Sequence, residues 1–117
     1  VYSLVRPFSE LQATWFQAAT GRPWAVPGVY DPVSDFLPWP SYEIEHYFWI
    51  PKEQQKPQWF SYTVTSMVQT WVDQPASNAG FIIKGTYPHD TWQPITSSEY
   101  WDPALRPRLL IIYYPRP

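Results

Sequence analysis

Apolar residues in this 117-residue chain come in short runs, and several of these runs alternate with polar residues. Alternation with a period of two is typical of β-strands that bury one face. The strongest strand pattern is RLLIIYY, residues 108–114, which Pro107 and Pro115 enclose. Proline is excluded from helix interiors and from central strand positions, so the prolines divide the chain into short elements. The predicted strands are residues 1–5, 42–50, 59–64, 81–84 and 108–114, and residues 95–97 show a weaker strand pattern.

One short helix is predicted directly after residues 59–64. Thr65 is the expected N-cap, because its hydroxyl can accept a hydrogen bond from a free amide of the first turn. The helix should stop at residues 73–75, which read Asp-Gln-Pro. About two turns with a single apolar stripe would result. The apolar residues at helical spacing are Met67, Val68, Trp71 and Val72.

Short strands with one brief helix predict an all-β fold, an antiparallel β-sandwich of jelly-roll type. We expect residues 1–117 to form a single, partial domain of this kind, with residues 30–58 as an irregular insertion rich in proline and aromatic residues. About five strands are too few to close two packed sheets. The chain also begins without methionine, inside a strand pattern. We therefore expect strands of another chain, or of a missing N-terminal part, to complete the sandwich.

Composition and charge exclude several function classes. The chain has 15 Pro, 4 Gly and no Cys, and 20% of its residues are aromatic. With 8 Lys and Arg against 10 Asp and Glu it has no basic stripe, which argues against nucleic acid as a partner. No apolar run approaches 18 residues, so no membrane span is predicted.

Candidate catalytic groups are few. The histidines are His46 and His89, and no serine lies in the glycine pattern of a nucleophile elbow. Glu43 and Glu45 could form a carboxylate pair, although such pairs are common on solvated strand faces. We therefore interpret the chain as non-catalytic, without a cofactor.

No metal site is assigned, because the loop carboxylates lack the regular spacing of a calcium-binding loop. A structural calcium ion is the alternative that these loop oxygens leave open. They belong to Asp31, Asp35, Asp73, Asn78, Asp90 and Asp102.

Aromatic residues outside the regular patterns are the candidates for contact with a ligand or partner. Trp and Tyr stack on sugar rings and are enriched at protein interfaces. These candidates are Trp39, Tyr42, Tyr47, Trp49, Trp92, Tyr100 and Trp101. Trp15, Trp59 and Trp71 fall on predicted buried faces and are expected in the core. Glu10, Glu99 and Arg106 are interpreted as structural polar residues, with Glu99 and Arg106 as an ion pair that ties a loop to the last strand.

Several longer motifs resemble a known family. They are RPFSELQATWFQAATGRPWAVPG near the N-terminus, then FSYTVTSMVQTWV, SNAGFIIKG and SSEYWDPALRPRLLIIYY. Together, over most of residues 1–28 and 59–114, they resemble the DNRLRE-type, disaggregatase-related extracellular β-sandwich modules. This resemblance implies an extracellular or cell-surface location and a kinship with carbohydrate-binding modules, some of which bind acidic polysaccharides such as alginate.

Two functional hypotheses follow. In the first, the chain is a structural subunit of a cell-surface or extracellular multi-chain assembly, such as a fibre, a surface layer or a matrix complex, and its partners are other protein chains. In the second, it is a carbohydrate-binding module that attaches a surface protein or enzyme to an acidic polysaccharide. A groove for acidic sugars should combine an exposed Trp with Lys or Arg, whereas an assembly subunit needs no cationic groove.

Overall fold

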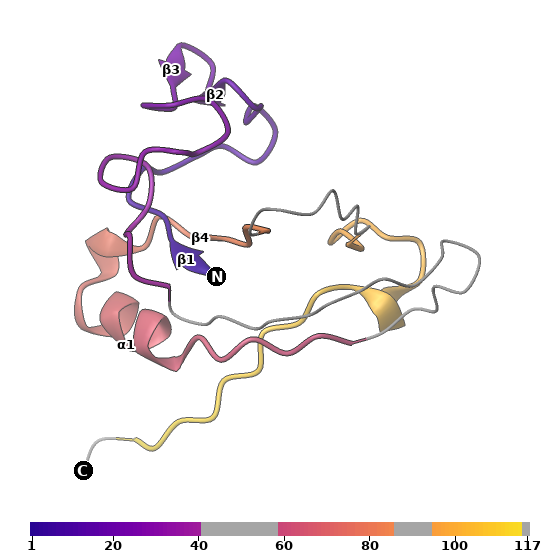
Figure 1. The fold of residues 1–117 in the computed structure, drawn as a ribbon. Helices are drawn as coiled ribbons and strands as arrows, with labels where there is room; N and C mark the ends of the chain where they lie inside the picture. Colours follow the sequence, from indigo (N-terminus) through magenta and orange to yellow (C-terminus); the bar gives the residue numbers. More distant parts are fainter. Residues whose placement is uncertain (41–58, 86–94, 116–117) are drawn as a thin grey trace. The chain divides into compact units, whose positions relative to one another are not determined.

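The computed structural model describes residues 1–40, 59–85 and 95–115. The chain separates into two compact units, Val1–Thr86 and Tyr87–Pro117. Figure 1 colours the chain along the sequence from indigo to yellow.

Two short antiparallel sheets lie in the first unit. Strand β1 (Tyr2–Ser3) pairs with β4 (Phe81–Ile82), and Figure 1 shows the two side by side. Strand β2 (Gln17–Ala19) pairs with β3 (Arg22–Pro23) in a hairpin. Its turn includes Gly21 at a φ of 73°, a conformation that glycine adopts without steric cost.

Further backbone hydrogen bonds extend the β1–β4 ladder. The Leu4 N–H donates to the Gly80 carbonyl over 2.9 Å, and the Leu37 N–H donates to the Ser3 carbonyl over 2.9 Å. An antiparallel bridge also joins Leu4 to Phe36. Three stretches that are distant in sequence therefore meet at the N-terminal strand.

The prediction of a jelly-roll β-sandwich is wrong. The described residues hold four short strands in two two-stranded sheets. The predicted strand 1–5 is reduced to β1 and the bridge at Leu4, and 81–84 is reduced to β4. Residues 59–64, 95–97 and 108–114 belong to none of these four strands, since an apolar pattern does not by itself determine which segments pair.

The expectation that strands from elsewhere complete a sandwich is overturned for the same reason, since the described residues form no partial sandwich to complete. The predicted strand 42–50 lies outside the described residues, as does most of the 30–58 insertion.

The predicted short helix is confirmed as α1 (Thr65–Asp73). Its N-cap is Val64, one residue before the expected Thr65, and no side chain caps the first turn. At the other end the Gln74 N–H donates to the Thr70 carbonyl over 2.8 Å. The short 3₁₀ helix η2 (Pro75–Ser77) then begins, with proline at a position where its missing N–H costs nothing.

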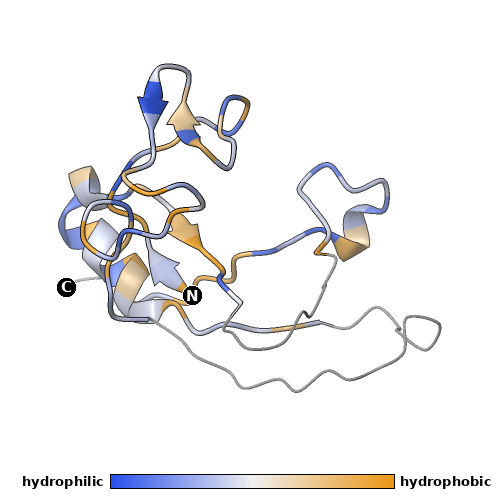
Figure 2. Cartoon of the chain, turned by 45° about the horizontal axis from the view of Figure 1, so that its top comes forward, coloured by the Kyte–Doolittle hydropathy of each residue, from blue (hydrophilic) through white to orange (hydrophobic). Residues whose placement is uncertain are grey.

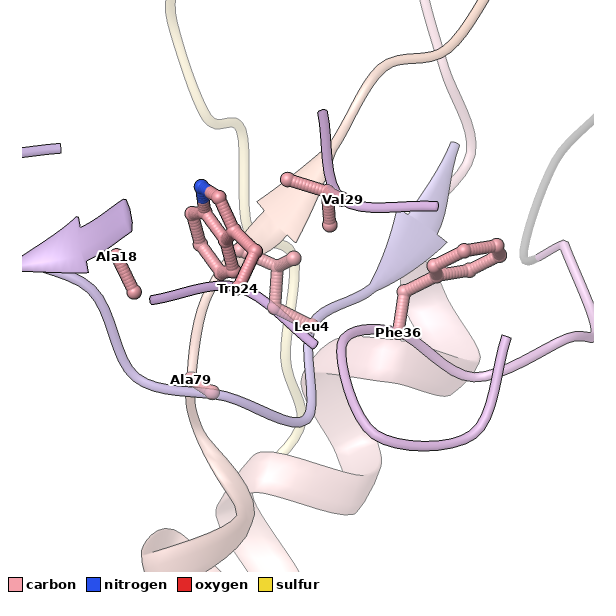
Figure 3. Close-up of a cluster of buried hydrophobic side chains, with 6 residues drawn as sticks. All are labelled: Leu4, Ala18, Trp24, Val29, Phe36 and Ala79. Carbon is pink, nitrogen blue, oxygen red and sulfur yellow. The ribbon is translucent and has the colours of Figure 1, made fainter. Parts of the chain in front are cut away.

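A small apolar core holds the first unit together. Figure 3 shows its six buried side chains, of which one lies in β2 and the others lie beside strands or in the loops between them. The Trp24 indole N–H donates to the Thr14 carbonyl over 2.9 Å, which satisfies its polar atom inside the core. The core residues are Leu4, Ala18, Trp24, Val29, Phe36 and Ala79.

The expectation that Trp15 and Trp59 belong to the core is wrong, since both side chains are 59% exposed, and Trp71 is half-buried. Apolar residues (orange in Figure 2) also lie along loops of the described chain.

The second unit is built on turns. Its 3₁₀ helix η3 (Pro103–Leu105) is capped by Asp102, whose carboxylate accepts from the Ala104 N–H over 2.9 Å. The Thr96 hydroxyl donates to the Leu105 carbonyl over 2.5 Å. No helix in the described parts of either unit has the length and apolar character that crossing a bilayer requires.

Candidate functional site

The structure describes three of the seven predicted aromatic contact residues. Trp39 and Trp101 are the most exposed of them, at 79% and 78%. Tyr100 is half-buried and packs against Trp101 with ring centroids 5.7 Å apart at an interplanar angle of 40°. Trp39 belongs to the first unit and the Tyr100–Trp101 pair to the second. The other four, Tyr42, Tyr47, Trp49 and Trp92, lie outside the described residues.

Trp39 lies at a groove beside α1. The groove has a volume of about 230 Å³, and no residue that lines it carries a charge. Its lining includes the buried Met67 and two hydroxyl-bearing residues, Ser66 and Thr70. The Thr70 hydroxyl donates to the Ser66 carbonyl over 3.0 Å and keeps its lone pairs available. The lining residues are Ser3, Leu37, Trp39, Pro40, Ser66, Met67 and Thr70.

The second candidate is the 109–114 segment, six consecutive apolar residues near the end of the described chain. Every one of them is exposed, by 54% to 91%. None lies in a strand, and no backbone hydrogen bond joins them to the rest of the described 95–115 region. Soluble proteins rarely expose a continuous apolar stretch of this length unless another molecule covers it. Its residues are Leu109, Leu110, Ile111, Ile112, Tyr113 and Tyr114.

A third feature is the buried carboxylate of Asp35, which the sequence suggested only as a calcium ligand. Its side chain has no exposed surface. One oxygen, Oδ1, accepts from the Ala25 N–H over 2.8 Å and from the Arg6 Nε–H over 3.1 Å. The other, Oδ2, accepts from the N–H groups of Val26 over 3.1 Å and Asp31 over 3.4 Å. These donors are dispersed between positions 6 and 31, so no local motif marks the site.

These donors keep Asp35 ionised. Burial on its own would raise the pKa of Asp35, but the three backbone N–H donors and the Arg6 guanidinium outweigh it, and the pKa lies below its usual value. Arg6 and Asp35 form the ion pair within the described residues. Because all four contacts are internal, the carboxylate ties the loop 25–35 to the N-terminal strand rather than facing a substrate.

Lys84 is held in the same region. Its ammonium group donates to the Val29 carbonyl and lies over the rings of Tyr30 and Phe36, 4.2 Å and 4.3 Å from the centroids. Burial lowers the pKa of Lys84, while the Asp35 carboxylate acts in the opposite direction. The contacts to a carbonyl and two aromatic rings are those of a structural cation–π clamp.

The predicted structural polar residues have other partners. The Arg106 guanidinium donates to the Tyr100 carbonyl over 2.7 Å, and the Glu99 carboxylate accepts from the Ser98 hydroxyl over 3.2 Å. Glu10 is exposed. We expected an ion pair between Glu99 and Arg106, but Arg106 instead binds the Tyr100 carbonyl.

Several carboxylate oxygens that were candidates for a calcium ion accept hydrogen bonds from the protein itself. The Asp31 carboxylate accepts from the N–H groups of Val33 and Ser34, both over 2.9 Å, as an ordinary turn does. The Asp35 carboxylate accepts four hydrogen bonds, and the Asp102 carboxylate caps η3. Asp90, His46, His89, Glu43 and Glu45 lie outside the described residues, and within the described ones no three candidate ligands gather.

Comparisons with known proteins yield no relative. No family model, no curated protein and no solved structure matches this chain. The resemblance to the DNRLRE-type modules therefore stays a prediction, and the functional interpretation depends on the exposed surfaces described above.

Proposed function

We propose that this chain is a non-catalytic structural subunit of a multi-chain assembly and that it docks onto another protein chain through the 109–114 segment. The observation that carries the proposal is the exposure of six consecutive apolar residues, whose backbone forms no hydrogen bond with the rest of the described 95–115 region. The extracellular or cell-surface location stays a prediction.

Both the backbone and the side chains of this segment favour a protein partner. Extended backbone with free N–H and C=O groups can add to the edge of a sheet, and the hydrogen bonds it gains supply affinity. Its side chains include two tyrosines, a residue type enriched at protein interfaces. Pro107 and Pro115 limit the length over which pairing can extend.

The polar features support a role without catalysis. Asp35 has no exposed surface, and the Lys84 ammonium is held by a carbonyl and two rings. A catalytic acid or nucleophile must reach a substrate within hydrogen-bonding distance, which neither arrangement offers.

Photo-cross-linking tests this proposal. A photoreactive phenylalanine analogue at Tyr113 should form covalent products with protein chains in the cells that make this protein. The same analogue at Leu11, which is 96% exposed but in the first unit, is the matched control. Products that mass spectrometry maps to position 113 and that vanish on Ile111→Lys support docking at this segment. Equal yields from positions 113 and 11 would contradict it.

A second candidate function, carbohydrate binding, is favoured by the groove at Trp39. An exposed indole beside apolar and hydroxyl-bearing residues suits the stacking of one sugar ring. Because no lining residue is cationic, the groove favours a neutral sugar over the acidic polysaccharide expected from the family resemblance.

Titration with sugars followed by NMR tests this candidate. A neutral β-glucan hexasaccharide should shift the amide resonances of Ser66 and Thr70, and Trp39→Ala should abolish the shifts. Trp101→Ala, an equally exposed tryptophan in the other unit, should leave them unchanged. An alginate hexasaccharide that binds as strongly, or binding that survives Trp39→Ala, would contradict the assignment.

A further inference from the structure

We infer that the chain that docks on the 109–114 segment is a further copy of this protein, with the segments of several copies pairing antiparallel and stacking as a cross-β ribbon. This inference rests on the proposed function and names the partner of the same site. It follows from the symmetry of the segment, from its lack of charge and from the shortness of the sheets described above.

The segment presents the same chemistry on both of its faces. In an extended strand, successive side chains point to opposite sides. Residues 109, 111 and 113 read Leu-Ile-Tyr, and so do residues 110, 112 and 114. A strand that is apolar on both faces must be covered on both faces, whereas one that faces water on one side alternates with polar residues.

One antiparallel register fits two copies well. With the two-fold axis between Ile111 and Ile112, Ile111 opposes Ile112, Leu110 opposes Tyr113, and Leu109 opposes Tyr114. Aliphatic–aromatic and β-branched pairs of this kind stabilise antiparallel strands. Arg108 then lies opposite Pro115, so the two arginines do not face each other. A two-fold interface of identical patches is the commonest way in which protein copies associate.

Two copies leave the ribbon unfinished. A two-stranded ribbon still exposes Leu, Ile and Tyr on both faces, so a second ribbon should pack on it about 10 Å away. Six residues without charge, proline or glycine are the pattern that favours such stacking. Pro107 and Pro115 confine it to this segment.

The other described parts of the chain offer no better acceptor. The described sheets contain strands of two or three residues, which are too short to receive six. The segment is also free of charge, so nothing on it selects a partner of complementary charge. A second copy, in contrast, supplies a matching strand of the same length and the same faces.

Sedimentation velocity of the purified full chain over a range of concentrations tests this inference. The wild-type chain should associate beyond the dimer as its concentration rises. Ile111→Lys should weaken this association by more than about tenfold, since each pairing would bury a lysine against an isoleucine. Leu11→Lys makes the same charge change at an exposed site in the first unit and should leave association unchanged. Circular dichroism of α1 checks that each variant is folded, and Tyr113→Lys serves as the second variant.

The possible failures are distinct. A chain that stays monomeric at every concentration overturns self-pairing, and so does equal weakening by Ile111→Lys and Leu11→Lys. If that monomer still cross-links from position 113 to a different protein, the inference fails while the proposed function stands. If it cross-links to nothing, both fail.

Discussion

Asparagine in place of Asp35 is expected to lower the free energy of unfolding of the first unit by about 2–4 kcal/mol. Both oxygens of the carboxylate accept hydrogen bonds, Oδ1 from Ala25 and Arg6 and Oδ2 from Val26 and Asp31. An asparagine has one acceptor oxygen, so its NH₂ group would face two N–H donors. The Arg6 guanidinium would also lose its counter-charge.

Asp31→Asn is the matched control. The Asp31 carboxylate uses a single oxygen, Oδ1, to accept from Val33 and Ser34, and asparagine retains an equivalent acceptor. We expect this variant to change stability by less than about 0.5 kcal/mol. Urea unfolding followed by circular dichroism measures both variants. Equal stabilities of Asp35→Asn and wild type would show that the Asp35 contacts do not hold the loop.

The lowered pKa of Asp35 gives the same prediction a pH dependence. A carboxyl group whose pKa is lower in the folded state stabilises that state fully above its unfolded value of 3.8. This stabilisation is lost as the pH falls from that value through the folded pKa. The difference in stability between wild type and Asp35→Asn should therefore shrink as the solution is acidified below about pH 4.

Local patterns were the part of the fold that the sequence predicted well. The spacing of Met67, Val68, Trp71 and Val72 located α1, because a helix makes its hydrogen bonds within one segment. Even there, the N-cap position is Val64 rather than Thr65, and no side chain caps the first turn.

Pairing between distant segments could not be predicted in this way. Strand β1 pairs with β4 across about eighty residues, and the alternation of either run does not name the other. The 109–114 segment shows the same limit more strongly. Its apolar pattern predicted the best strand of the chain. Such a pattern indicates that the side chains favour burial, but it does not identify the segment or chain that buries them.

The core and the polar site depended on geometry that is also non-local. Trp24 is buried while Trp15 is exposed, although both lie in the same loop-rich region, because Trp24 packs on Leu4 and Val29 of the core. Asp35 was considered only as a calcium ligand, since its partners Arg6, Ala25 and Val26 share no spacing with it. Trp39, in contrast, was predicted as a contact residue because it lies outside the regular patterns, and it lines the groove beside α1.

In dilute solution, the amides of the 109–114 segment should exchange with solvent at least about a hundredfold faster than the paired amides of Leu4 and Val68. The Leu4 N–H donates to the Gly80 carbonyl over 2.9 Å, and the Val68 N–H donates to the Val64 carbonyl over 3.0 Å. No such partner protects residues 109–114 within the described 95–115 region. The contrast should be among the largest effects that this structure predicts.

Hydrogen exchange of these amides, measured by NMR in the dilute monomer, tests most directly whether the 109–114 segment is uncovered until another chain binds it. The structure predicts near-unprotected rates at all six positions, with protection gained only when a partner chain is bound. Amides of residues 109–114 that exchange as slowly as those of Leu4 and Val68 in the monomer would show that the chain covers the segment itself, and would contradict docking at this site.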